Sequence, residues 1–167
     1  MTKSKKLKVG DKFIERGKVY RIFKIEKATY EGKTERLIHY CPHYKNSLNK
    51  TLVCSIPESS LIISNIRTPI PKKEITELLG RLAKRSKKKK VYDVDEAKLT
   101  LNLNDIYKTA DVLRKYWRKK NKDIESFTKV QKDVLEMAMN RLVEEVALVK
   151  GLSLTDAEDK IITTLKD

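Results

Sequence analysis

Positions 67–73 read "RTPIPKK", and the hydrophobic pattern of the chain changes there. Pro69 and Pro71 mark a boundary in the chain, and Pro71 is well placed for the first turn of a helix. Before this segment, short apolar runs alternate with turn sequences; after it, apolar residues recur at intervals of three and four. The first pattern is typical of strands and the second of helices. We therefore expect a β domain followed by a helical domain.

The stretch before the prolines has the sequence pattern of antiparallel β structure. Runs such as "KVYRIFKI" and "TLVCSI" are separated by turn material such as "YEGKTE". In "TLVCSIP", Leu52, Cys54 and Ile56 alternate with their neighbours, which predicts one better-buried face. Four or five short strands must close or be covered to hide their edges. This predicts a small β barrel over residues 6–67.

The stretch after the prolines predicts a helical domain over residues 72–167. Its periodicity predicts five helices, at residues 72–85, 95–102, 104 or 105–121, 126–150 and 155–165. Thr128 with Gln131, and Thr155 with Glu158, have the spacing of capping boxes at the last two starts. The predicted fold class is α+β, a small barrel followed by an all-helical domain.

The chain is strongly basic, but its charge is unevenly distributed. The 167 residues include 38 Lys and Arg against 23 Asp and Glu, a formal net charge of +15. Residues 1–122 carry 32 basic and 13 acidic side chains, whereas residues 123–167 carry 6 and 10. A positive field of this size attracts polyanions and speeds their encounter. Nucleic acid is therefore the first partner to consider, and an anionic membrane surface the second.

The sequence gives little support for a membrane protein, a secreted protein or an enzyme. No apolar run reaches the roughly 18 residues of a membrane span, and no apolar stretch follows the charged start. Two cysteines suggest no disulfide framework, so we expect a soluble, cytoplasmic protein. Neither a Gly-rich phosphate loop nor G-x-S-x-G nor H-E-x-x-H occurs. Glu144 and Glu145 are expected on an exposed helical face, so we expect no enzymatic activity and no cofactor.

Histidines and cysteines near the third predicted strand raise the question of a metal site. Imidazole and thiolate suit zinc, and alternate residues of a strand point the same way. The candidates are His39, Cys41, His43 and Cys54. Their spacing fits no strong zinc signature, Pro42 interrupts the strand, and Cys54 lies on the predicted buried face. We expect no metal, although the sequence leaves this open.

The stretch "VLRKYWRKKNKD", residues 112–123, holds the only tryptophan, Trp117, among six cationic side chains. Trp117 lies at one edge of the apolar arc of its helix, next to Arg114 and Arg118. Two interpretations stay open: the indole caps the core, or it projects as a wedge for the minor groove of DNA. Likewise, the basic run at residues 81–90 is either a solvated loop or a sequence-blind phosphate clamp.

A series of segments from Lys8 to the last helix resembles those of a known family: "VGDKF", "GKVYRIFKIE", "EGKTERLIHY", "TLVCSIP", "ADVLRKYWRKKN" and "LEMAMNRLVEEVALVKG". The family that they resemble is the CarD and CdnL family of bacterial transcription factors. The most specific part of this resemblance is "VLRKYWRK". It implies that a Tudor-like barrel binds the β-subunit lobe of RNA polymerase. It also implies that the helical domain presents Trp117 to the upstream edge of the melted promoter.

These implications assign residues to two sites. The residues expected to bind promoter DNA are Trp117, Arg114, Arg118, Lys119 and Lys120. Those expected to bind the polymerase are Tyr30, Arg36 and Ser55. Two positions that are often arginine at the polymerase contact of that family are Ala28 and Ser55 here, and "CPHYKNSLNK" is a longer insertion.

The expected function is that of a transcription regulator that holds RNA polymerase by its barrel and stabilises the open promoter complex by its helical domain. It is expected to act as a monomer at the nucleoid, without membrane contact. One alternative is a nucleic-acid-binding protein independent of polymerase, with RNA as a candidate ligand, because aromatic and basic side chains on a barrel offer stacking surfaces. A second is an adaptor whose barrel binds another protein.

Overall fold

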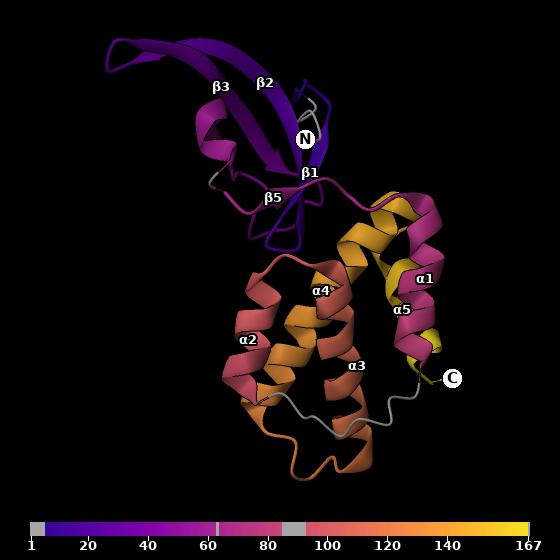
Figure 1. The fold of residues 1–167 in the computed structure, drawn as a ribbon. Coiled ribbons are helices and arrows are strands. Elements are labelled where there is room, and N and C mark those ends of the chain that lie inside the picture. The colour runs from indigo at the N-terminus through magenta and orange to yellow at the C-terminus, as the bar shows by residue number, and fades with distance from the viewer. Residues whose placement is uncertain (1–5, 63, 85–92, 167) are drawn as a thin grey trace. The chain divides into compact units, whose positions relative to one another are not determined.

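A computed structural model describes residues 6–62, 64–84 and 93–166, except for the side chains at positions 30 and 62. The chain divides into two compact units, residues 1–68 and residues 69–167. The first unit is built around a curled sheet and the second is helical (Figure 1). The α+β fold class predicted from the sequence is confirmed.

The first unit is one five-stranded antiparallel sheet with the order β4-β3-β2-β1-β5. Its elements are β1 (Lys12–Glu15), β2 (Lys18–Tyr30), β3 (Lys33–Pro42), β4 (Cys54–Pro57), the 3₁₀ helix η1 (Glu58–Ile62) and β5 (Ile66–Arg67). Two-residue turns, Arg16–Gly17 and Glu31–Gly32, connect the first three strands, and all four residues have positive φ. Such turns match the right-handed twist of strands in a hairpin. In the part of the chain that is described, β4 and β5 are not paired with each other, so the sheet is a half-barrel.

A cluster of buried side chains forms the core of this unit. Phe13, Ile22, Ile38 and Tyr40 are buried together, with the rings of Phe13 and Tyr40 edge to face at 5.0 Å. Cys54 packs against this core, as the alternation in its strand predicts. Leu52, which was predicted to share that face, is 43% exposed, because β4 begins only at Cys54.

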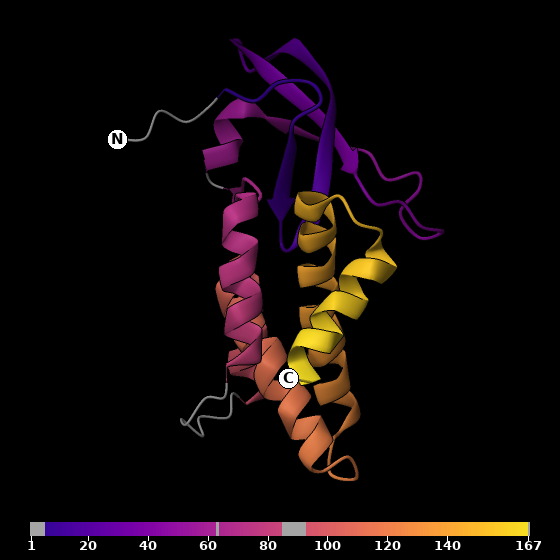
Figure 2. The same cartoon turned by 90° about the vertical axis from the view of Figure 1, so that its right-hand side faces the viewer.

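The described residues of the second unit form five helices, as predicted. They are α1 (Lys72–Ala83), α2 (Val94–Asn102), α3 (Ile106–Lys122), α4 (Lys129–Lys150) and α5 (Leu154–Lys166). The long helix α4 contacts each of the other four, and α5 also lies against α1 (Figure 2). The apolar arc predicted on α3 is buried in this unit from Ile106 to Tyr116. The predicted end of the first helix, residue 85, lies outside the described residues.

Side-chain caps decide where the last two helices begin. Thr128 and Gln131 form the predicted capping box, so α4 begins at Lys129 and not at the predicted position 126. The box predicted for Thr155 and Glu158 is wrong. Ser153 instead accepts a hydrogen bond from the amide of Asp156 at 3.0 Å, and α5 begins one residue before Thr155. A serine hydroxyl is a strong N-cap, and here it precedes the first helical residue.

Glu145 is fully buried, which corrects the prediction that it lies on an exposed face. Its Oε1 accepts a hydrogen bond from the backbone amide of Ile70 at 2.9 Å. Ile70 lies between Pro69 and Pro71, so this bond holds the entrance of α1 against α4. A buried carboxylate needs such a partner, because an unpaired buried charge would destabilise the fold.

Candidate nucleic-acid interface

Helix α3 carries the cationic residues predicted to bind DNA. The side chain of Asp105 caps its start by accepting hydrogen bonds from the amides of Tyr107 and Lys108 at 2.9 and 3.1 Å. Its last turn contains Lys119, Lys120 and Lys122. Cations are favourable at the carboxyl end of a helix because the helix dipole is negative there. The same residues that stabilise this end therefore also concentrate positive charge on it.

Trp117 lies one turn before that end and is partly buried. Its indole Nε1 is inaccessible to solvent and has no hydrogen-bond acceptor among the described residues. The ammonium group of Lys120 lies 6.0 Å from the ring centroid, at the outer range of a cation–π contact. The ring is therefore neither fully buried nor fully projecting, and its single polar atom has no hydrogen-bond partner among the described residues.

Arg114 and Arg118 cap the carboxyl end of α1. Arg114 is only 8% exposed, and its Nη1 donates to the carbonyl oxygens of Arg81 and Lys84 at 2.7 and 3.3 Å. Its Nη2 donates to Asp111 at 3.3 Å. Nη2 of Arg118 donates to the carbonyl oxygen of Lys84 at 2.7 Å. The last carbonyls of a helix lack partners within the helix, so these arginines satisfy them.

This arrangement differs from two free guanidinium groups beside the indole. Arg114 is only 8% exposed and is already bonded to Arg81, Lys84 and Asp111, so little of its guanidinium group is open to a phosphate. Its role in DNA binding stays a prediction that the observed bonding does not favour. The partners lie 30 and 33 residues away in the sequence, so no local pattern could have indicated them. Of the basic run at residues 81–90, positions 85–90 lie outside the described residues.

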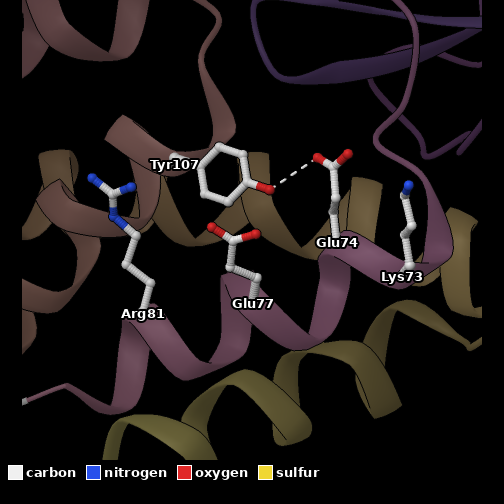
Figure 3. A pocket seen from close by; sticks show the side chains of 5 residues that line it. All are labelled: Lys73, Glu74, Glu77, Arg81 and Tyr107. Carbon is white, nitrogen blue, oxygen red and sulfur yellow. Dashed lines mark hydrogen bonds between the residues drawn. The ribbon is translucent and has the colours of Figure 1, made fainter.

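A pocket on the helical unit brings together side chains from α1 and α3 (Figure 3). It is lined by Lys73, Glu74, Glu77, Arg81 and Tyr107. The hydroxyl of Tyr107 donates to Glu74 at 2.9 Å, while the guanidinium of Arg81 lies 5.6 Å from the tyrosine ring. Burial and this carboxylate raise the pKa of Tyr107 to about 12, so its hydroxyl stays protonated at neutral pH. Arg81 also forms two bonds to Asp111, at 3.0 and 2.6 Å. The lining groups thus stabilise the packing of α1 on α3.

The residues predicted to bind polymerase lie in the first unit. Arg36 bonds to Glu58 at 2.5 Å and to the carbonyl oxygen of Leu7 at 2.6 Å, so it connects β3 with η1 and the N-terminal segment. The side chain of Tyr30 lies outside the described residues. Ser55 is exposed on β4, and its Oγ lies 2.7 Å from Nδ1 of His39. Whether these residues contact a polymerase stays a prediction.

His39 takes part in a hydrogen-bonded chain and not in a cluster of potential metal ligands. Its Nε2 lies 2.8 Å from Oε1 of Glu26, whose other oxygen is 2.6 Å from the ammonium group of Lys24. Hydrogen bonds from Lys24 and then from His39 lower the pKa of Glu26. In the described ranges, no three His, Cys, Asp or Glu side chains are grouped so that they could hold a metal ion.

Comparison with known protein families identifies the helical unit. The family model described as "CarD, C-terminal domain" matches residues 74–162, which include all of α2, α3 and α4. The chain belongs to the CarD family. CarD proteins are non-enzymatic transcription regulators, so this chain is a CarD-like, transcription-related protein. A search of curated proteins found no match.

The CarD match covers α3, with Trp117 and the lysines of its last turn. The first unit lies outside the matched residues, so its description depends on its own structure. None of the helices in the described ranges is long and apolar enough to span a membrane.

Proposed function

We propose that this CarD-family protein binds the β-subunit lobe of RNA polymerase through its first unit and stabilises the open promoter complex through its helical unit. The observation that carries the proposal is the carboxyl end of α3. There a partly buried tryptophan lies beside a turn with three lysines, within the region that matches the CarD C-terminal domain. An apolar plane flanked by cations is the combination that minor-groove wedges use.

The mechanism requires only weak contact with DNA. Lysine side chains neutralise phosphates without reading sequence, so their contribution is similar on every promoter and falls as salt rises. Binding to polymerase raises the effective concentration of the helical unit next to the upstream DNA, which converts a weak encounter into an intramolecular one. The indole of Trp117 then contacts the edge of the melted region. A favourable contact made only in the open state lengthens the lifetime of that state.

The lifetime of open complexes tests this function directly. Purified bacterial RNA polymerase is allowed to open a promoter with or without the full-length protein, and decay is followed after addition of a polyanionic competitor. We expect slower decay with the protein, together with its retention on immobilised polymerase. Retention without any change in decay would favour an adaptor. Equal DNA binding with and without polymerase would favour a nucleic-acid-binding protein independent of polymerase.

A further inference from the structure

A β-bulge in the first unit brings an aromatic side chain to the outer face of the sheet. In the β2–β3 ladder, Ile22 pairs with Tyr40 and Lys24 pairs with His39, so Phe23 is an extra residue. Ile22 and Ile25 both pack into the core. In a regular strand, two residues that are three positions apart point to opposite faces, so the bulge is what allows both to face the core. The bulge therefore leaves Phe23 and Lys24 side by side on the outer surface. Bulges re-aim side chains in this way and are frequent at functional sites.

The neighbours of Phe23 form a hydrogen-bonded chain across three strands. Glu26 on β2, His39 on β3 and Ser55 on β4 are joined by contacts of 2.8 and 2.7 Å. Because a carboxylate can only accept, Nε2 of His39 carries the proton, and in the neutral imidazole Nδ1 accepts from the Ser55 hydroxyl. Both ring nitrogens are thus bonded and the imidazole is fixed. The ring centroid of Phe23 lies 6.2 Å from that of His39, so the phenyl group stands beside a rigid polar support.

Phe23 is 40% exposed, whereas the other tyrosine and phenylalanine side chains that the structure describes in the first unit are buried or half-buried. Exposed aromatic side chains on a fixed backbone are the groups that most often anchor protein interfaces, since they bury much apolar area at little entropic loss. The predicted polymerase contact Ser55 is bonded to the histidine beside it. Arg36, the other described candidate, is held by Glu58 and Leu7. Among the described residues of the first unit, the exposed aromatic side chain on this face of the sheet is therefore Phe23.

We infer that Phe23 is the anchor through which the first unit docks into an apolar pocket with a polar rim on RNA polymerase, with His39 as its oriented polar neighbour. This inference rests on the proposed function and names the residues that carry its polymerase contact. Two positions that are often arginine at the polymerase contact of the family are Ala28 and Ser55 here, so they provide no guanidinium group. In this inference, Phe23 and His39 supply the contact area instead.

A protein fits this surface better than a nucleic acid does. Single strands bind to sheets through stacked aromatic rings and cations that face the phosphates. Here Glu26 lies among the candidate contacts and already pairs with Lys24 at 2.6 Å. Its negative charge repels phosphates and offsets the lysine. A polar rim on a protein can donate to such a carboxylate, whereas a phosphate backbone cannot.

The experiment compares full-length variants for binding to purified bacterial RNA polymerase. Phe23→Ala removes the anchor, and Leu48→Ala is the matched control, because Leu48 is 93% exposed in the insertion between β3 and β4. We expect Phe23→Ala to weaken binding by roughly 10-fold or more, the range of an interface anchor, and Leu48→Ala to leave it unchanged. Ser55→Ala should weaken it less, because the imidazole loses one of its two supports. Thermal unfolding of each variant confirms that the first unit is intact.

The possible outcomes distinguish a failure of this inference from a failure of the proposed function. Polymerase binding by Phe23→Ala equal to wild type would overturn the inference and leave the proposed function standing. A wild-type protein that fails to bind polymerase would overturn both. A Phe23→Ala variant that keeps its polymerase affinity but loses affinity for a single-stranded RNA oligonucleotide would identify a stacking surface instead, and would also overturn the inference.

Discussion

Replacing Trp117 by alanine and by phenylalanine separates its structural role from its proposed contact with DNA. A fully buried tryptophan replaced by alanine destabilises a protein by roughly 3–5 kcal/mol. Trp117 is only partly buried, and its Nε1 is a buried donor without an acceptor among the described residues. Such an unsatisfied donor costs about 1–3 kcal/mol, which either substitution removes. We therefore expect Trp117→Ala to lower the free energy of unfolding by roughly 1–3 kcal/mol, and Trp117→Phe to stay within about 1 kcal/mol of wild type.

Chemical denaturation measures these differences, and the fluorescence of the single tryptophan reports directly on the site in the wild-type protein. The functional readout is open-complex lifetime at saturating protein, at a temperature where all variants are folded. We expect Trp117→Ala to lose most of the lengthening and Trp117→Phe, which keeps an aromatic plane, to retain part of it. A loss of stability above about 4 kcal/mol in Trp117→Ala would identify a core residue. Unchanged promoter lifetime with intact polymerase binding would exclude the indole from the mechanism.

Three further predictions concern charged side chains. Arg114→Ala should destabilise the helical unit by roughly 2–4 kcal/mol, because the carbonyl oxygen of Arg81 loses its donor and Asp111 loses one of its two arginine partners; in chemical denaturation, a change below about 1 kcal/mol would contradict its role as a cap. Exchanging Lys119 and Lys120 for glutamine should flatten the log-log salt dependence of DNA binding by up to about two units on unrelated sequences, and a loss confined to one sequence would argue for base readout. Since the pKa of Glu26 is lowered from 4.5 in the folded protein, its contribution to stability is present above pH 4.5 and is lost as the pH falls below that value. An NMR titration in which this carboxyl shows a pKa above 4.5 would contradict the observed bonding with Lys24 and His39.

The sequence predicted the fold because the periodic patterns on either side of Pro69 and Pro71 are long and consistent. The capping box at Thr128 and Gln131 was also visible, because its donors and acceptors lie within one turn. The start of α5 was predicted wrongly because Ser153 and Thr155 both offer a hydroxyl group near it. Only the observed backbone shows that Ser153 is the residue that caps the helix.

Features that depend on contacts between distant segments could not be predicted from the sequence. Burial of Glu145 follows from its bond to the amide of Ile70, 75 residues earlier. The bulge at Phe23 was hidden because one extra residue shifts the alternation of a strand without leaving a turn signal. Arg114 was expected to face DNA because it stands beside Trp117 on the helix, yet its position also faces the carboxyl end of α1. A helical projection cannot distinguish these two directions.

The distribution of cations on α3 bears on how a CarD-like protein could act on many promoters. Arg114 and Arg118 donate to the carbonyl oxygens that end α1, a task that suits the planar, multiple-donor guanidinium group. Lys119 and Lys120 lie on the last turn, where a flexible ammonium group acts as a point charge. If the arginines maintain the packing of the helices, DNA contact depends mainly on lysines, which read phosphates and not bases. Selectivity for the melted region would then come from polymerase, which places the unit, and from Trp117, the aromatic side chain that we propose contacts the edge of that region.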